Sequence, residues 1–184
     1  MNRNGNNRSS PLRRDLVALT LAAAAAAVTI NANAASDIFA KIGDIKGESP
    51  DDKHKDQVEV LSWSWGVTGA QRKTPLCPHE FTINKSLDRS TPPLITATAQ
   101  GTVFPQASIS VRKAGSLEED YLTITLTNAV ITSYDSKAVI TLDKVSEMMT
   151  LAYASATISY KMQQADGTFG APFVSTVGPS CPPP

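Results

Sequence analysis

The chain has 184 residues, in which 17 Lys and Arg balance 17 Asp and Glu. The first 34 residues, interpreted below as a targeting segment, hold four Arg and one Asp, so the other 150 carry 13 basic and 16 acidic side chains, a net charge of −3. This balance argues against nucleic acid or anionic lipid as the main partner, because binding phosphate requires concentrated positive charge. A domain of this size can bury enough apolar surface to fold alone.

The N-terminal segment has the pattern of a secretory signal peptide. A basic front precedes the Ala-rich stretch from Leu16 to Ile30, and Ala32-Asn33-Ala34 offers the small residues that signal peptidase needs. We predict export to the periplasm or the exterior, with cleavage after Ala34. The Arg13-Arg14 pair leaves the twin-arginine route open beside the general secretory route. A membrane anchor is not expected, because a spanning helix needs about 20 predominantly apolar residues.

Strand patterns dominate residues 35–184, which we interpret as one domain with a Pro-rich C-terminal tail. Asp37–Ile42 and Val58–Gly66 are predicted strands, joined by a polar loop over 43–57. In the second strand, Val58, Val60 and Ser62 alternate with Glu59, Leu61 and Trp63, as in a half-buried strand. A second loop follows over 66–80.

One short helix is predicted over 90–101. Ser90 or Thr91 can cap it, Pro92 and Pro93 suit its first turn, and Gly101 can end it. Its β-branched residues weaken it, so its stability must come from packing on the sheets.

Further strands are predicted after this helix. The segments over 108–112 and 122–127 alternate apolar and polar residues, and the polar face of the second carries Thr123 and Thr125. Such a face tolerates water or a neighbouring subunit. One long strand is predicted from Met149 to Gln163, then a turn over 165–167 and a last strand interrupted by Pro172.

No group of residues has the spacing of a known catalytic or cofactor site. Asp51, Asp52, His54 and Asp56 could bind a metal, but the lysines between them would repel a cation, so we expect a solvated charged loop. Cys77 and His79 are too few for a structural zinc site. We therefore predict no catalytic residue, no metal, no cofactor and no enzymatic activity.

The two cysteines, Cys77 and Cys181, are candidates for one disulfide in an exported protein. Two free or intermolecularly paired thiols are the alternative. Trp63 and Trp65 lie on one side of a strand, since side chains two residues apart do. They could bind sugar or peptide, but filling the core or a subunit interface is the favoured interpretation.

Several separated phrases, in order, carry a resemblance to a known family. They are DIFAKIGDIKGES, DDKHKDQ and VEVLSWSWG within residues 37–66, FPQASISVRKAG at 104–115 and YLTITLTNAVITS at 121–133. Over roughly residues 36 to 167, the chain resembles the Hcp family, the tube-forming proteins of the bacterial type VI secretion system. The resemblance implies a mainly β barrel of two packed antiparallel sheets with one flanking helix.

The resemblance also implies assembly rather than catalysis. Hexameric rings would stack into a tube that can carry effectors in its lumen and meet spike and sheath proteins. The subunit-interface residues placed by analogy and by position are Asp44, Lys46, Glu48, Trp63, Trp65, Thr123 and Thr125. The export signal leaves a second interpretation open, an exported binding protein, monomeric or oligomeric, that keeps the fold without building tubes.

Overall fold

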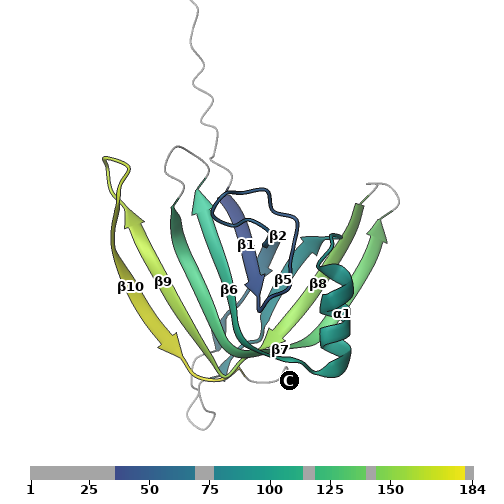
Figure 1. The fold of residues 1–184 in the computed structure, drawn as a ribbon. Helices are drawn as coiled ribbons and strands as arrows, with labels where there is room; N and C mark the ends of the chain where they lie inside the picture. The colour runs from purple at the N-terminus through teal and green to yellow at the C-terminus, as the bar shows by residue number, and fades with distance from the viewer. Residues whose placement is uncertain (1–35, 69–76, 114–118, 140–143, 181–184) are drawn as a thin grey trace, which may run out of the picture. The chain divides into compact units, whose positions relative to one another are not determined.

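The computed structural model describes residues 36–68, 77–113, 119–139 and 144–180, all within one compact unit, Ala32–Pro184. This part of the chain forms ten strands and one helix. Figure 1 shows how the longer elements are arranged. The predicted signal peptide over 1–34 lies outside the described residues. Within the described part, no helix is long and apolar enough to cross a bilayer. The elements are β1 (Ser36–Ile42), β2 (Val58–Ser64), β3 (Val67–Thr68), β4 (Cys77–Pro78), β5 (Phe81–Ser86), α1 (Thr91–Gln100), β6 (Val103–Lys113), β7 (Asp120–Val139), β8 (Lys144–Ala152), β9 (Ser155–Gln163) and β10 (Phe169–Val177).

The main sheet closes on itself as a barrel. Its strand order is β10-β9-β7-β6-β1-β2-β5-β8, and a further pairing of β7 with β8 joins the last strand back to the third. Six strands therefore form the closed wall, and β9 and β10 extend it as a two-stranded ribbon beside β7. The predicted β barrel with one flanking helix is confirmed. The sheets expected in its wall are joined edge to edge as one continuous antiparallel sheet.

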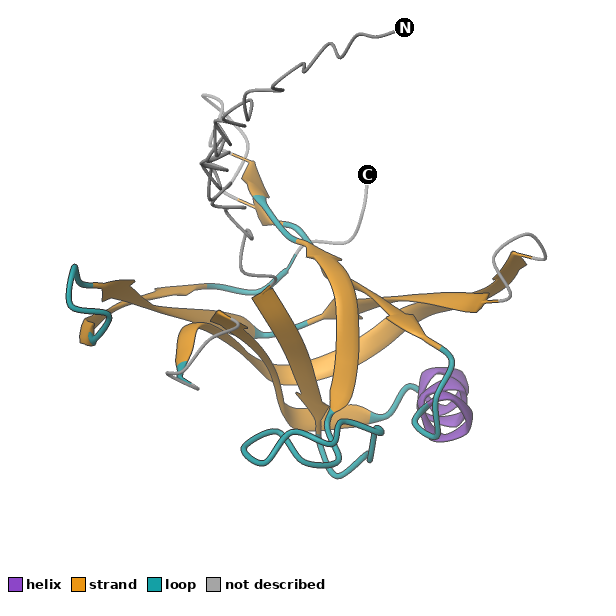
Figure 2. Ribbon diagram, turned by 90° about the horizontal axis from the view of Figure 1, so that it is seen from above, coloured by secondary structure: helices purple, strands orange, loops and turns teal. Residues whose placement is uncertain are grey.

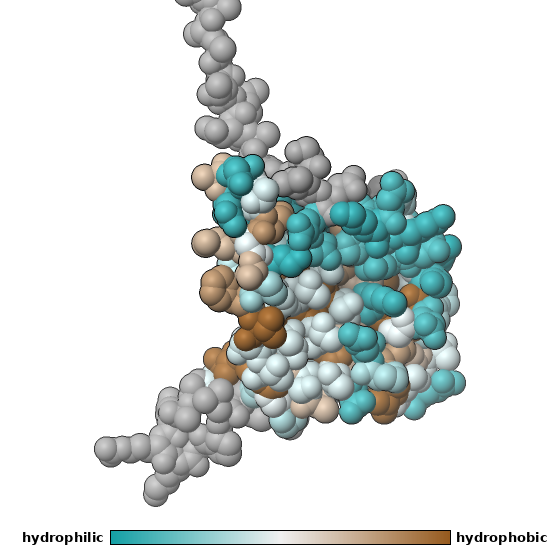
Figure 3. All heavy atoms as spheres, turned by 60° about the vertical axis from the view of Figure 1, so that its left-hand side comes forward, coloured by the Kyte–Doolittle hydropathy of each residue, from teal (hydrophilic) through white to brown (hydrophobic). Residues whose placement is uncertain are grey.

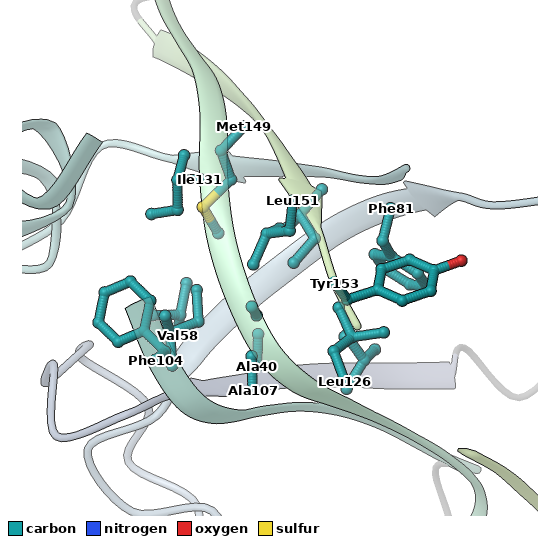
Figure 4. Close-up of a cluster of buried hydrophobic side chains, with 14 of the residues drawn as sticks. Ala40, Val58, Phe81, Phe104, Ala107, Leu126, Ile131, Met149, Leu151 and Tyr153 are labelled. Carbon is teal, nitrogen blue, oxygen red and sulfur yellow. The ribbon is translucent and has the colours of Figure 1, made fainter. Parts of the chain in front are cut away.

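The barrel interior is an apolar core. Figure 4 shows side chains from several strands, among them Phe81, Leu126, Met149 and Leu151, pointing toward one another. All four are fully buried. Inward residues recur at every second position of β8 and within the first half of β7, and the inward positions of β7 shift by one residue at Asn128. The barrel is thus filled by side chains, and binding surfaces have to lie on its exterior.

The helix α1 lies outside the barrel wall (Figure 2). It begins after Ser90, carries Pro92 and Pro93 in its first turn, and ends at Gly101, whose φ of 61° is left-handed. These positions agree with the predicted helix. Leu94 is fully buried within the core cluster, so packing holds this short helix in place.

A β-bulge in β2 overturns the predicted strict alternation. Val60 pairs with Lys85 and Ser62 pairs with Asn84, so Leu61 is an extra residue in β2. After the bulge, the positions of the strand that face the core are shifted by one residue. Trp63 turns toward the core, while Leu61 is 61% exposed.

The predicted single strand from Met149 to Gln163 is wrong, because the chain breaks between β8 and β9 at Tyr153 and Ala154. Both strands pair with the same edge of β7: β9 along its first half and β8 along its second. Asn128 of β7 adopts a left-handed φ of 49° between the two halves. The bend in β7 means that no straight strand could pair with both halves.

Candidate assembly surfaces

The predicted Thr-bearing face lies on the outside of the sheet and continues across three strands. In one cross-strand row Thr123 pairs with Ser159, which pairs with Val174; in the next, Thr125 pairs with Thr157, which pairs with Thr176. We call these six residues the hydroxyl face. The hydroxyl groups of Thr157 and Thr176 lie 3.0 Å apart. None of the six is charged, so a second protein surface could cover this face without desolvating an ion.

The same rows continue onto β6 and β1, where the chain covers itself. Phe39 pairs with Ser110, which pairs with Thr123, so all three face outward. His54, from the loop over 43–57, stacks on Phe39 with ring centroids 4.3 Å apart. The prediction that this loop is simply solvated is wrong, because His54 is only 6% exposed.

Two arginines fix the loop over 43–57. Arg112 of β6 forms an ion pair with Asp51, and this contact holds the pKa of Asp51 below its ordinary value. Arg89, just before α1, pairs with Asp56 and donates a hydrogen bond to the Gly47 carbonyl. The Gly47 N–H in turn donates to the Asp56 carbonyl at 2.8 Å. The loop therefore has a defined conformation held by long-range contacts.

The loop interface residues placed by analogy are exposed. Asp44 and Lys46 are exposed, and they lie close to the β1 end of the loop. Glu48 is exposed as well, and its carboxylate accepts a hydrogen bond from the Arg89 backbone N–H at 3.0 Å. These three alternating charges thus project from a fixed part of the loop, and nothing among the described residues buries them.

Trp63 and Trp65 lie half-buried over one core residue. Both rings pack on Phe81, with centroid distances of 5.4 and 6.4 Å. The Trp65 indole N–H donates to the Tyr153 hydroxyl at 2.6 Å, and that hydroxyl donates to the His79 carbonyl. This placement fits the core-filling interpretation, while part of each side chain stays open to a neighbour.

The ribbon of β9 and β10 carries apolar side chains that the sequence interpretation did not single out. Val174 is 62% exposed on the hydroxyl face, and Phe173, next to it and therefore on the opposite face, is 67% exposed. Tyr160 and Met162 of β9 are exposed too. Figure 3 turns this side forward and shows brown and pale spheres over much of the lower surface, with teal ones gathered higher. Period-two alternation of apolar and polar residues cannot reveal which of these apolar side chains stay uncovered.

A buried charge network beneath α1 was also missed. Lys85 and Glu147 are 0% and 1% exposed, and their charged groups lie 2.6 Å apart. The Lys85 ammonium also contacts Asp88 and Thr91, and Tyr134 donates to the Glu147 carboxylate. Burial raises the pKa of Glu147, but these hydrogen bonds outweigh it and hold the pKa below its ordinary value. The network fixes the start of α1 against β5, β7 and β8.

The predicted disulfide falls largely outside the described residues. Cys181 is not described, and Cys77 is described only as a backbone position in β4. Among the described residues, no three His, Cys, Asp or Glu side chains come together as a metal site would require. Asp51 and Asp56, considered as ligands in the sequence, are instead paired with arginines.

Comparison with known proteins identifies similar chains. A family model described as "Type VI secretion system effector, Hcp" matches residues 39–160. The protein hcp1 of Pseudomonas aeruginosa is 36% identical over 142 residues, which are 72% of this chain and 88% of that one.

Solved structures show the same fold. Hcp1 from Salmonella typhimurium superposes with a TM-score of 0.67 at 30% identity, covering 78% of this chain and 94% of that one. A type VI secretion system effector from Yersinia pestis gives 0.66 at 29% identity, covering 77% and 99%.

Proposed function

This chain belongs to the Hcp family of type VI secretion proteins, and from that premise we propose that it closes into hexameric rings whose lateral contact uses the hydroxyl face. Membership of the family makes it a secreted, structural ring- and tube-forming protein of the type VI secretion system. The number of subunits in a ring and the residues that join them are the proposed part of this function.

The uncharged hydroxyl face is the observation that carries the lateral contact. A ring needs a heterologous contact that closes by rotation, so one surface of each protomer has to fit a different surface of the next. Thr123, Thr125 and Thr157 present short polar groups on a pleated sheet, and Val174 adds an apolar group beside them. Such a surface can be buried at low desolvation cost, because each hydroxyl can find a partner across the contact.

The loop over 43–57 supports a proposal for stacking. Asp44, Lys46 and Glu48 alternate in charge and project from a loop that Arg89 and Arg112 hold in place. Fixed charges of both signs can match a complementary set on the adjacent ring, which sets the register of stacking more than its strength. Trp63 and Trp65 are proposed to stiffen the wall from within, through their contacts with Phe81.

The predicted signal peptide supports a variant of this function. A chain cleaved after Ala34 would be exported by its own leader, and its rings would work in the periplasm or outside the cell. Effectors in the lumen, and spike or sheath proteins at the tube ends, are further proposed partners. An exported binding protein that keeps the fold as a monomer is the competing proposal.

Light scattering coupled to size-exclusion chromatography tests the ring. We expect the mass of about six protomers, and we expect Val174→Asp to lower it, because each contact would then bury a charge without a partner. Leu87→Asp is the matched control, since Leu87 is 56% exposed and lies outside the hydroxyl face.

A strict monomer at high protein concentration would remove the ring and favour the binding protein. A hexamer that survives Val174→Asp, or that Leu87→Asp disrupts equally, would move the lateral contact away from the hydroxyl face.

A further inference from the structure

The loop over 43–57 forms a small cavity where it leaves and rejoins the barrel. The volume of this cavity is about 140 Å³, which is room for a small ion together with several waters. Its charged lining consists of Lys41 from β1 and of Asp44, Lys46, Lys55 and Asp56 from the loop. Lysines therefore outnumber carboxylates at this cavity, although residues 35–184 as a whole carry a net charge of −3.

The three lysines have no ion-pair partner in the part of the chain that the structure describes. Asp56, in contrast, is paired with Arg89. The hydrogen bond from Arg89 holds the pKa of Asp56 below its ordinary value, and the charges of Lys46 and Lys55 lower this pKa further. With Arg89 and Asp56 counted as a neutral pair, the three lysines and Asp44 give the cavity a net charge of +2.

Other charges near the cavity do not reverse this sign. Glu48 does not line the cavity, and its carboxylate accepts a hydrogen bond from the Arg89 backbone N–H. Counting Glu48 as well would still leave a net charge of +1. The residues of β6 that pair with the end of β1, Ala107 and Ser108, are uncharged. An anion approaching the cavity is therefore attracted.

The backbone keeps the three lysines around one site. The Gly47 N–H donates to the Asp56 carbonyl at 2.8 Å, which joins the limb of the loop that carries Lys46 to the limb that carries Lys55. Lys41 lies on β1, which pairs along its length with β6. The like charges are thus gathered by the fold before any ligand arrives. A bound anion would relieve their mutual repulsion, and little ordering of the backbone would be needed.

We propose that this cavity is a binding site for a small dianionic oxyanion of the phosphate class, held by the ammonium groups of Lys41, Lys46 and Lys55. Each ammonium group has three N–H donors and no acceptor, which suits the oxygens of such an ion. Two negative charges balance the net charge of +2, so a dianion should bind more tightly than chloride. The site is built by one chain alone, so it does not depend on ring formation.

Calorimetric titration of the full chain at about pH 8 tests the site, with chloride holding the ionic strength constant. We expect one inorganic phosphate to bind per chain with saturation. Glycerol 3-phosphate distinguishes an esterified phosphate from the free ion, and binding of either supports the site. Lys46→Gln and Lys55→Gln should each weaken binding by about threefold or more. Lys137→Gln, an exposed lysine of β7 outside the cavity, should leave binding unchanged.

Asp44→Asn gives a second test that removes no lysine. Loss of this carboxylate raises the net charge of the cavity, so phosphate should bind about twofold or more tightly. Glu59→Gln removes an exposed carboxylate outside the cavity and is the matched control. Heat that does not saturate with either phosphate, equal weakening in Lys46→Gln and Lys137→Gln, or unchanged affinity in Asp44→Asn would overturn the site. Exposed substitutions of this kind change stability little, so all of these variants should fold.

Discussion

At the scale of single residues, the least expected feature is a complete charge network inside a secreted structural protein. Lys85 and Glu147 are fully buried, and Asp88, Thr91, Tyr134 and Ser136 use their remaining hydrogen-bonding capacity. Burying two ions is costly, and the pair is tolerated only because its hydrogen bonds are complete. Such a network adds little net stability but strongly disfavours any position of α1 that breaks it.

Removing one charge from this network should therefore lower the free energy of unfolding more than removing both. We expect Glu147→Gln to lower the free energy of unfolding by about 3 kcal/mol, because it weakens the pairing of a buried ammonium. Adding Lys85→Met should recover part of that loss. Urea unfolding at fixed protein concentration measures both changes, and Glu59→Gln, on the exposed side of β2, is the control.

The pH dependence of this network has a defined sign. The folded-state pKa of Glu147 lies below its ordinary value of 4.5, so its contribution is complete above that pH and is lost as the pH falls through the folded-state value. A loss below about 1 kcal/mol for Glu147→Gln, or a double variant less stable than the single one, would contradict the assignment.

At the scale of elements, the sequence predicted most strands and the helix but missed features that depend on distant residues. The Pro-Pro first turn and Gly101 determine the ends of α1 locally, so that prediction is confirmed. The bulge at Leu61 and the break at Tyr153 depend on β5 and β7, which no local alternation describes. The Thr side of the candidate site was predicted, whereas the burial of His54 was not, since its partners Phe39 and Asp120 lie far away in sequence.

Gly47 is a position in the loop over 43–57 where only glycine fits. A Cβ on Gly47 would lie 2.2 Å from the Gln57 carbonyl oxygen and 2.6 Å from the Val58 Cα, and both are backbone atoms. We expect Gly47→Ala to destabilise the protein by about 2 kcal/mol, because the loop cannot close without shifting β2. Thermal unfolding and proteolysis within residues 43–57 measure the effect.

Gly178→Ala is the control for that substitution, since nothing lies within 4 Å of a Cβ placed there. If Gly47→Ala unfolds like Gly178→Ala and its loop resists protease equally, then the close approach of Gly47 to Gln57 does not constrain the loop.

At the scale of the whole molecule, the barrel closes through one long strand, β7, whose partner on one edge changes along its length. β7 pairs with β6 from Asp120 to Val130, with β9 over its first half and with β8 over its second. That exchange leaves the ribbon of β9 and β10 projecting with exposed apolar side chains on both faces, and it places Tyr153 at the junction. Closure of this kind joins segments distant in sequence, which explains why the exposed ribbon could not be predicted from the pattern of β9 and β10 alone.

The same junction supports the proposed Cys77–Cys181 disulfide. The Tyr153 hydroxyl donates to the carbonyl of His79, two residues after Cys77, at 2.8 Å. The Tyr153 backbone exchanges hydrogen bonds with Ser180, the residue before Cys181, at 2.9 and 3.0 Å. One residue thus holds both cysteine-bearing segments, so we expect the oxidised exported protein to contain this bond.

Mass spectrometry of the unreduced protein should find the two cysteine peptides joined and no thiol open to alkylation. Reduction should lower the free energy of unfolding by about 2 to 5 kcal/mol, because the bond closes a long loop in the unfolded chain. Cys77→Ser and Cys181→Ser should each reproduce that loss and become insensitive to reductant. Two alkylated thiols in the oxidised protein, or a dimer linked through them, would instead show that the tail is held by Tyr153 alone.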